Sequence, residues 1–218
     1  MKILFFDTET TGLPVNFYEP YTNTENWPRL VQLAWITEET DTKEKKENDL
    51  IIRPEGFTIP EEAAKIHNIT TEFAERDGVE LRAALADFVQ DMLAADLLVA
   101  HNIEFDKNVI CSEINRTALK LMSEDKILLE VGFCIPKYFL NKRSICTMKL
   151  GTNYTKIKTD GGDYKWPKLI ELYRHFFGKD FEGMHDALDD IRATRDCFWE
   201  MVRLTGDINL NHIEKLLL

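Results

Sequence analysis

The sequence contains little cysteine, and its cysteines form no metal-binding or redox pattern. Only four of the 218 residues are cysteines, and no two of them make a C-x-x-C pair. A zinc site or a disulfide framework is therefore not expected. We expect all four to be small residues of the core: Cys111, Cys134, Cys146 and Cys197.

Long apolar runs are also absent. The longest candidate, 97–100, has the length of a strand, whereas a helix needs about 20 apolar residues to cross a bilayer. The first residues pass from one lysine through a short apolar run into acids, with neither the long apolar core nor the cleavage site of an export signal. We therefore expect a cytoplasmic protein that does not associate with membranes.

The sequence also has fewer basic than acidic residues. The chain has 27 Lys and Arg residues against 38 Asp and Glu residues, which gives a net charge of −11. This balance argues against a protein that holds nucleic acid through a broad basic surface. It leaves open an enzyme that grips only the last few nucleotides of a strand, where bound divalent cations neutralise the local acids.

The remaining composition is that of a globular protein, with 44% hydrophobic and 30% charged residues. Its length predicts one α/β domain, residues 1–206, followed by an accessory helix or tail, residues 207–218. Apolar runs predict strands at 3–7, 31–37, 49–53 and 97–100. Helical spacing predicts helices at 80–95, 106–122, 167–178 and 187–204. Residues 151–165, rich in Gly, Thr, Asn and Asp, predict a flexible loop.

Two acids lie at the end of the first predicted strand. Asp7 and Glu9 are two residues apart, so the pleat directs both carboxylates to one face and Thr8 to the other. Without a partner, two carboxylates in one small volume repel, and a divalent cation removes that conflict. A solvated pair of surface acids is the alternative interpretation of this pattern.

Two later segments carry further acids in an order that a sheet can bring together. Asp106 lies near a predicted strand-to-helix junction, where α/β proteins usually form their sites, and Glu104 competes with it for that role. Asp186 is a candidate N-cap of the last helix, which places Asp190 near its first turn and His185 in the preceding loop.

The three segments DTETTG, AHNIEFD and HDALDD resemble the three exonuclease motifs of the DEDDh family, and together they extend from Ile3 to Asp190. Within that family the sequence looks most similar to the epsilon, or proofreading, subunit of bacterial DNA polymerase III and to stand-alone proteins like it. The resemblance implies a ribonuclease H-like α/β fold, with a mixed five-stranded sheet flanked by helices, whose first three strands are antiparallel. It also implies a 3′–5′ exonuclease that releases nucleoside 5′-monophosphates.

Carried over to this sequence, the resemblance makes His185 the general base and assigns two divalent ions, Mg²⁺ or Mn²⁺, to four carboxylates: Asp7, Glu9, Asp106 and Asp190. Asp7 is the candidate bridging ligand. The residues implied as substrate contacts are Thr8, Thr11, Gly12, Leu13 and Asn102. A plain tight turn explains Gly12 equally well, and Asn102 has an alternative role in satisfying a buried backbone group.

The remaining candidates have structural interpretations. His101 and His67 are expected to be structural, with His67 packed beneath the site. The four tryptophans are expected in the core, and Trp27 is the one most open to stacking on a base. Many relatives have an Asp-Thr pair on the strand after the second motif, whereas this chain has Ile-Cys-Thr-Met at 145–148, which bears on substrate preference.

Three functions remain in competition with a DNA exonuclease. An RNA 3′-end-trimming enzyme of the same family is the nearest, because nothing in the motifs separates the two sugars. A silent module that binds nucleic acid or a polymerase is the second, and the presence of all four acids and the histidine counts against it. A metal-dependent phosphatase or nuclease of another kind is the third. The expected partners are single-stranded 3′ ends, with DNA favoured over RNA, and a DNA polymerase is a further candidate.

Overall fold

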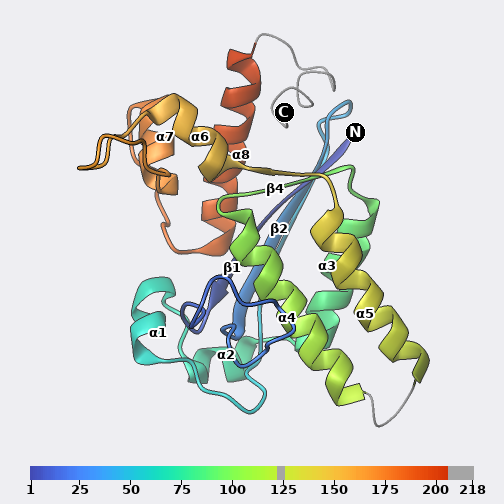
Figure 1. The fold of residues 1–218 in the computed structure, drawn as a ribbon. Coiled ribbons are helices and arrows are strands. Elements are labelled where there is room, and N and C mark those ends of the chain that lie inside the picture. The colour runs from blue at the N-terminus through green and yellow to red at the C-terminus, as the bar shows by residue number, and fades with distance from the viewer. Residues whose placement is uncertain (122–125, 206–218) are drawn as a thin grey trace.

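The computed structural model describes residues 1–121 and 126–205, and its centre is a mixed five-stranded sheet (Figure 1). The strand order is β3-β2-β1-β4-β5. β1 pairs antiparallel with β2, and β2 with β3, whereas β4 is parallel to both β1 and β5. The predicted fold class is therefore confirmed. The strands are Lys2–Thr10, Leu30–Glu39, Lys45–Ile51, Leu97–Ala100 and Ser144–Cys146 in chain order.

The central strand β1 is buried on both faces, as its continuous apolar run predicts. Leu4 and Phe6 pack into the larger core, and Ile3 and Phe5 pack into the core on the other side. The larger core is closed by helices α3 (Leu81–Ala94), α4 (Ile103–Leu121) and α5 (Lys126–Asn141). Helix α8 (Ala187–Leu204) closes the other (Figure 1). Both α4 and α8 thus begin near the end of β1 that carries the acids.

Four further helices surround this frame: α1 (Glu61–His67), α2 (Thr71–Asp77), α6 (Thr147–Thr155) and α7 (Leu169–Phe177). The sequence did not predict α1, α2, α5 or α6. Among the residues that the structure describes, no helix is both long and apolar enough to cross a membrane. The predicted accessory helix at 207–218 lies outside the described residues.

The predicted loop at 151–165 is wrong in its first part, because residues 151–155 complete α6. Gly151 is buried there, and a Cβ at this position would lie 2.8 Å from Leu172 Cδ1. This glycine permits close packing of α6 against α7 and does not loosen the chain. The rest of the segment turns back on itself through an antiparallel bridge between Lys158 and Tyr164.

Burial corrects two expectations about small and aromatic residues. Cys111 and Cys197 are buried as expected, whereas Cys134 is exposed and Cys146 is half-buried. Trp27 and Trp35 belong to the core, Trp199 is half-buried, and Trp166 is 59% exposed. Trp27 is therefore shielded from a stacking role, because its ring is covered and its Nε1 donates to the carbonyl of Pro20.

Candidate active site

The acids of β1 alternate in burial as the pleat requires. Asp7 and Glu9 are half-buried and Thr8 between them is buried. The Thr8 hydroxyl donates a 2.7 Å hydrogen bond to Asp106 Oδ1. This bond ties the second predicted motif to the first across 98 residues of sequence.

The third motif reaches the same place through the start of α8. Asp186 caps this helix, because its carboxylate accepts hydrogen bonds from the amides of Leu188 and Asp189. His185 precedes the cap with a φ of 67°, a left-handed conformation that is uncommon for a residue with a side chain and is concentrated at functional sites. The helix start and this turn together aim His185 and Asp190 at the end of β1.

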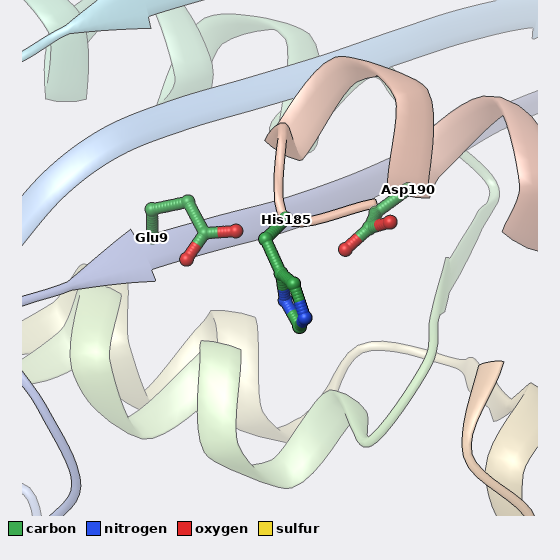
Figure 2. A group of neighbouring side chains, drawn as sticks. All are labelled: Glu9, His185 and Asp190. Carbon is green, nitrogen blue, oxygen red and sulfur yellow. The ribbon is translucent and has the colours of Figure 1, made fainter. Parts of the chain in front are cut away.

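Three predicted site residues form a compact group (Figure 2). One ligand atom each from Glu9, His185 and Asp190 lies within 4.8 Å of the others. In Figure 2 the imidazole lies between the two carboxylates, which come from β1 and α8. The fold thus brings Glu9 close to His185 and Asp190, which lie far from it in the sequence.

Asp106 reaches β1 from α4, and its environment differs from that of Glu104, the other acid of the second motif. Its side chain is 2% exposed, and its Oδ2 atom is buried without a hydrogen-bond partner. Glu104, by contrast, is exposed and forms an ion pair with Lys149. A buried carboxylate oxygen with no partner is costly, so Asp106 has the environment of a ligand and Glu104 that of a surface acid.

Burial raises the pKa values of all four carboxylates, and the charges of the other acids add to this at Asp7 and Glu9. Burial raises the pKa of Asp7 well above its usual value, and the charges of Asp106, Asp190 and Glu9 add to this. Burial and the charges of Asp190 and Asp106 raise the pKa of Glu9 to about 8. Burial also raises the pKa values of Asp106 and Asp190 to about 7, although the Thr8 hydroxyl opposes the shift at Asp106. Four carboxylates that resist ionisation together fit a site for hard divalent cations, whose charge would remove the conflict.

Two further histidines are structural, as expected. Burial lowers the pKa of His101 to about 4, and its ring nitrogens lie 3.1 Å from Thr147 Oγ1 and from the carbonyl oxygen of Pro167. His67 is buried and its Nδ1 accepts a hydrogen bond from the Ile69 amide. Burial lowers the pKa of His67, and the charge of His185 lowers it further, whereas the backbone of Thr10 raises it. Since both Thr10 and His185 act on its imidazole, His67 lies beneath the site.

The turn after β1 has an open face. Gly12 has a φ of 148°, which favours glycine, and a Cβ there would meet no atom within 4 Å. Leu13 is 75% exposed. Asn102 has a φ of 69° and its carbonyl accepts from the Phe105 amide at the start of α4. The substrate contacts expected of Thr8, Thr11, Gly12, Leu13 and Asn102 stay predictions, and the hydroxyl of Thr8 is already engaged with Asp106.

One positioning residue was missed. Gln32 on β2 is 2% exposed, its Nε2 donates to Asp49 Oδ1 at 2.7 Å, and its Oε1 accepts from the Ala187 amide at 3.4 Å. It therefore braces the first residue of α8 next to the His185–Asp186 turn. A polar residue inside the otherwise apolar stretch 30–36 was the available signal.

A carboxylate cluster at the end of the central strand of a mixed sheet is suited to metal-assisted hydrolysis of phosphodiesters. The exonuclease family model RNase_T matches residues 4–198, so this chain belongs to the exonuclease family. The predicted enzyme class is thereby confirmed. The particular likeness to the epsilon subunit stays a prediction.

Individual relatives agree with this assignment. The chain is 29% identical over 194 residues to the uncharacterized exonuclease CP81 of Escherichia phage 186, covering 88% of this chain and 83% of that protein. The fold is similar to that of E. coli exonuclease I in complex with a dT13 oligonucleotide, with a TM-score of 0.66 and 18% identity over 93% of this chain. Exonuclease I from Methylocaldum szegediense gives a TM-score of 0.62 at 18% identity over 94% of this chain. In both solved structures the match covers only 41% of the larger chain.

Proposed function

We propose that this protein is a 3′–5′ exonuclease that hydrolyses terminal phosphodiester bonds of single-stranded DNA and releases nucleoside 5′-monophosphates. The observation that carries the proposal is the convergence of Glu9, His185 and Asp190 within 4.8 Å, beside the half-buried Asp7 and the unpartnered oxygen of Asp106. An acid cluster of this kind is suited to metal-assisted chemistry on phosphate.

The carboxylates would hold two divalent ions, Mg²⁺ or Mn²⁺, through Asp7, Glu9, Asp106 and Asp190. When bound, such ions lower the pKa of an attacking water and stabilise charge on the scissile phosphate and the leaving oxygen. Thr8 keeps one oxygen of Asp106 fixed by its hydrogen bond, which leaves the other oxygen free to act as a ligand. The residues present therefore fit the ions that the family uses.

His185 is the residue placed to move the proton. It is exposed, so its imidazole is accessible to solvent and to a substrate end, and it lies between the carboxylates of Glu9 and Asp190. A neutral imidazole in this position accepts a proton from the attacking water, and the neighbouring carboxylates stabilise the imidazolium that forms. The N-cap at Asp186 and the brace from Gln32 hold the turn that presents it.

The terminal nucleotide would lie over the turn formed by Thr11, Gly12 and Leu13, with Asn102 on the opposite side. Gly12 leaves space for close approach of a substrate to the backbone, and the exposed Leu13 side chain is free to pack on a base. Solved exonuclease I structures of similar fold contain dT13 and dA16 oligonucleotides, which supports DNA as the strand. RNA trimming remains the alternative, and a DNA polymerase remains a candidate partner.

The test uses a single-stranded oligonucleotide labelled at its 5′ end, in DNA and RNA versions, with Mg²⁺, Mn²⁺ or a chelator. We expect a ladder that shortens from the 3′ end, nucleoside 5′-monophosphates as products, faster decay of DNA, and no reaction with the chelator. Glu104→Gln is the matched control for Asp106→Asn, because it removes an acid of the same motif that lies outside the cluster. Internal cuts, or activity that survives the chelator, would reject the proposal.

A further inference from the structure

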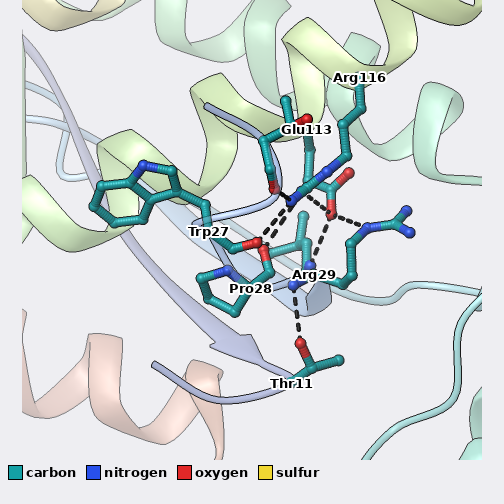
Figure 3. Close-up of polar contacts among 8 residues, drawn as sticks. Thr11, Trp27, Pro28, Arg29, Glu113 and Arg116 are labelled. Carbon is teal, nitrogen blue, oxygen red and sulfur yellow. Dashed lines mark hydrogen bonds and ion pairs between the residues drawn. The ribbon is translucent and has the colours of Figure 1, made fainter. Parts of the chain in front are cut away.

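Arg29 is joined to the turn that follows the catalytic acids of β1 (Figure 3). The Thr11 amide donates to the Arg29 carbonyl at 2.9 Å, and the Arg29 amide donates to Thr11 Oγ1 at 2.9 Å. Thr11 is two residues beyond Glu9. The backbone of Arg29 is thus fixed directly beside the turn expected to receive the terminal nucleotide.

The guanidinium group of Arg29 is held in one orientation. Its Nε donates to Glu113 Oε1 at 2.8 Å, and its central carbon lies 4.2 Å from the centroid of the Phe57 ring. Within residues 1–121 and 126–205, no hydrogen bond uses either of its Nη atoms, and the side chain is 21% exposed. Figure 3 shows both Nη atoms pointing away from the network. A planar guanidinium group that is held at its Nε, with both Nη groups available as donors, is suited to bind a phosphate.

Glu113 is paired with two guanidinium groups, those of Arg29 and Arg116. Glu113 is fully buried, and the same Oε1 atom forms an ion pair with Arg116 Nη1 at 3.1 Å. Two guanidinium groups therefore share one carboxylate. Arg116 has a structural task, because its Nη atoms donate to carbonyl oxygens of the preceding loop, those of Thr24, Trp27 and Pro28. Glu25 also acts on the charge of Arg116, so the feature that makes Arg29 available to a phosphate is its pair of outer Nη donors, in a protein whose net charge is −11.

The position of Glu113 on α4 relates this charge to the acid cluster. Glu113 follows Asp106 by seven residues, so both lie on one face of the helix, about 10 Å apart along its axis. Arg29 is therefore displaced from the reaction centre along α4. A phosphate bound by its Nη groups would therefore be one other than the scissile phosphate.

We propose that the two Nη groups of Arg29 bind a backbone phosphate of the substrate strand, on the 5′ side of the scissile bond. This inference rests on the proposed exonuclease function. Arg29 would thereby contribute affinity for a strand longer than one nucleotide and leave the chemical step unchanged. The competing role is a purely structural ion pair that joins the residue before β2 to α4.

The experiment compares wild type with Arg29→Met on two substrates in Mn²⁺: a single-stranded DNA oligonucleotide and the p-nitrophenyl ester of thymidine 5′-monophosphate, which has only the reacting phosphate. We expect KM for the oligonucleotide to rise tenfold or more, the scale of one charge-assisted hydrogen bond of about 1.5–3 kcal/mol. Its kcat and both constants for the ester should stay unchanged. The slope of log affinity against log salt for the oligonucleotide should fall by about 0.7, as for one lost phosphate contact.

Arg203→Met is the matched control. It removes a positive charge paired with Glu200 on α8, 13 residues beyond Asp190 and therefore about 20 Å along that helix. It should leave both substrates and the salt slope unchanged. If Arg29→Met does not fold, Arg29→Gln replaces it, because it removes the charge and keeps an amide donor for Glu113.

The outcomes separate the two proposals. An unchanged oligonucleotide KM, or an equal loss on the ester and the oligonucleotide, would overturn the role of Arg29 while wild-type cleavage of both substrates still supports the exonuclease. Wild-type protein that cleaves neither substrate in Mn²⁺ would overturn the proposed function itself, and this inference with it.

Discussion

Replacing Asp106 with Asn should inactivate the enzyme and at the same time stabilise its metal-free form at alkaline pH. Asp106 is buried, and burial raises its pKa from 3.8 to about 7. A raised pKa means that the folded state keeps a proton which the unfolded chain has already lost. Stability is therefore highest near the unfolded pKa and falls as the pH rises towards the folded pKa, by about 1.4 kcal/mol per pH unit.

The size of the effect follows from the two pKa values. Between pH 5 and pH 7 the wild-type carboxyl loses up to about 3 kcal/mol of stability, and asparagine, which does not titrate, loses none. The advantage of Asp106→Asn over wild type should thus grow by up to about 3 kcal/mol between pH 5 and pH 8. For a chain of this size that is a change in Tm difference of roughly 6 to 12 °C.

The assay is thermal unfolding of both proteins in a chelator at pH 5 and pH 8, with cleavage rates in Mg²⁺ measured alongside. We expect the rate of Asp106→Asn to fall by about 10³-fold or more, since a metal ligand is lost. Glu104→Gln, the exposed acid of the same motif, should change neither quantity. A Tm difference that is the same at both pH values would refute the reasoning, because the buried carboxylate would then carry no penalty.

Three further changes test other parts of the account. Mn²⁺ should raise the wild-type Tm more at pH 8 than at pH 5, because the cluster is then ionised; an equal rise at both would place the ion elsewhere. His185→Ala should lower the single-turnover rate by about 10²- to 10⁴-fold while calorimetry still detects Mn²⁺ binding, and an unchanged rate would remove His185 from the mechanism. Gly151→Val should reduce the free energy of unfolding by about 1–3 kcal/mol in denaturant titrations, because its Cβ would clash with Leu172; undiminished stability would contradict that packing.

Local patterns predicted the elements that position the site. The apolar run before Asp7 predicted the central strand, and the Asp186 cap with its following periodicity predicted α8 at its observed bounds, Ala187–Leu204. Both depend on interactions close in sequence: backbone alternation in one case and a side-chain cap in the other. The resemblance of the three motifs supplied the set of residues, and the fold brings Glu9, His185 and Asp190 together.

The helices and site features that the sequence did not predict depend on contacts between residues distant in sequence. Helices α1 and α2 have seven residues each, too short to be stable alone, and they form by packing Ala63 and Ala74 into a small core with Val31 of β2. Only the ion pair with Lys149 shows that Glu104 lies outside the cluster. The brace from Gln32 to Ala187 spans 155 residues, so no local pattern contains it.

The central claim is that the cluster of Asp7, Glu9, Asp106 and Asp190 holds the divalent ions used to cut a strand end. Anomalous X-ray scattering from crystals of wild-type protein soaked in Mn²⁺ tests it most directly. We expect anomalous peaks within bonding distance of these four carboxylates, including the unpartnered Oδ2 of Asp106, and loss of at least one peak in Asp106→Asn. Mn²⁺ peaks found only elsewhere on the protein, with none at the cluster, would contradict it.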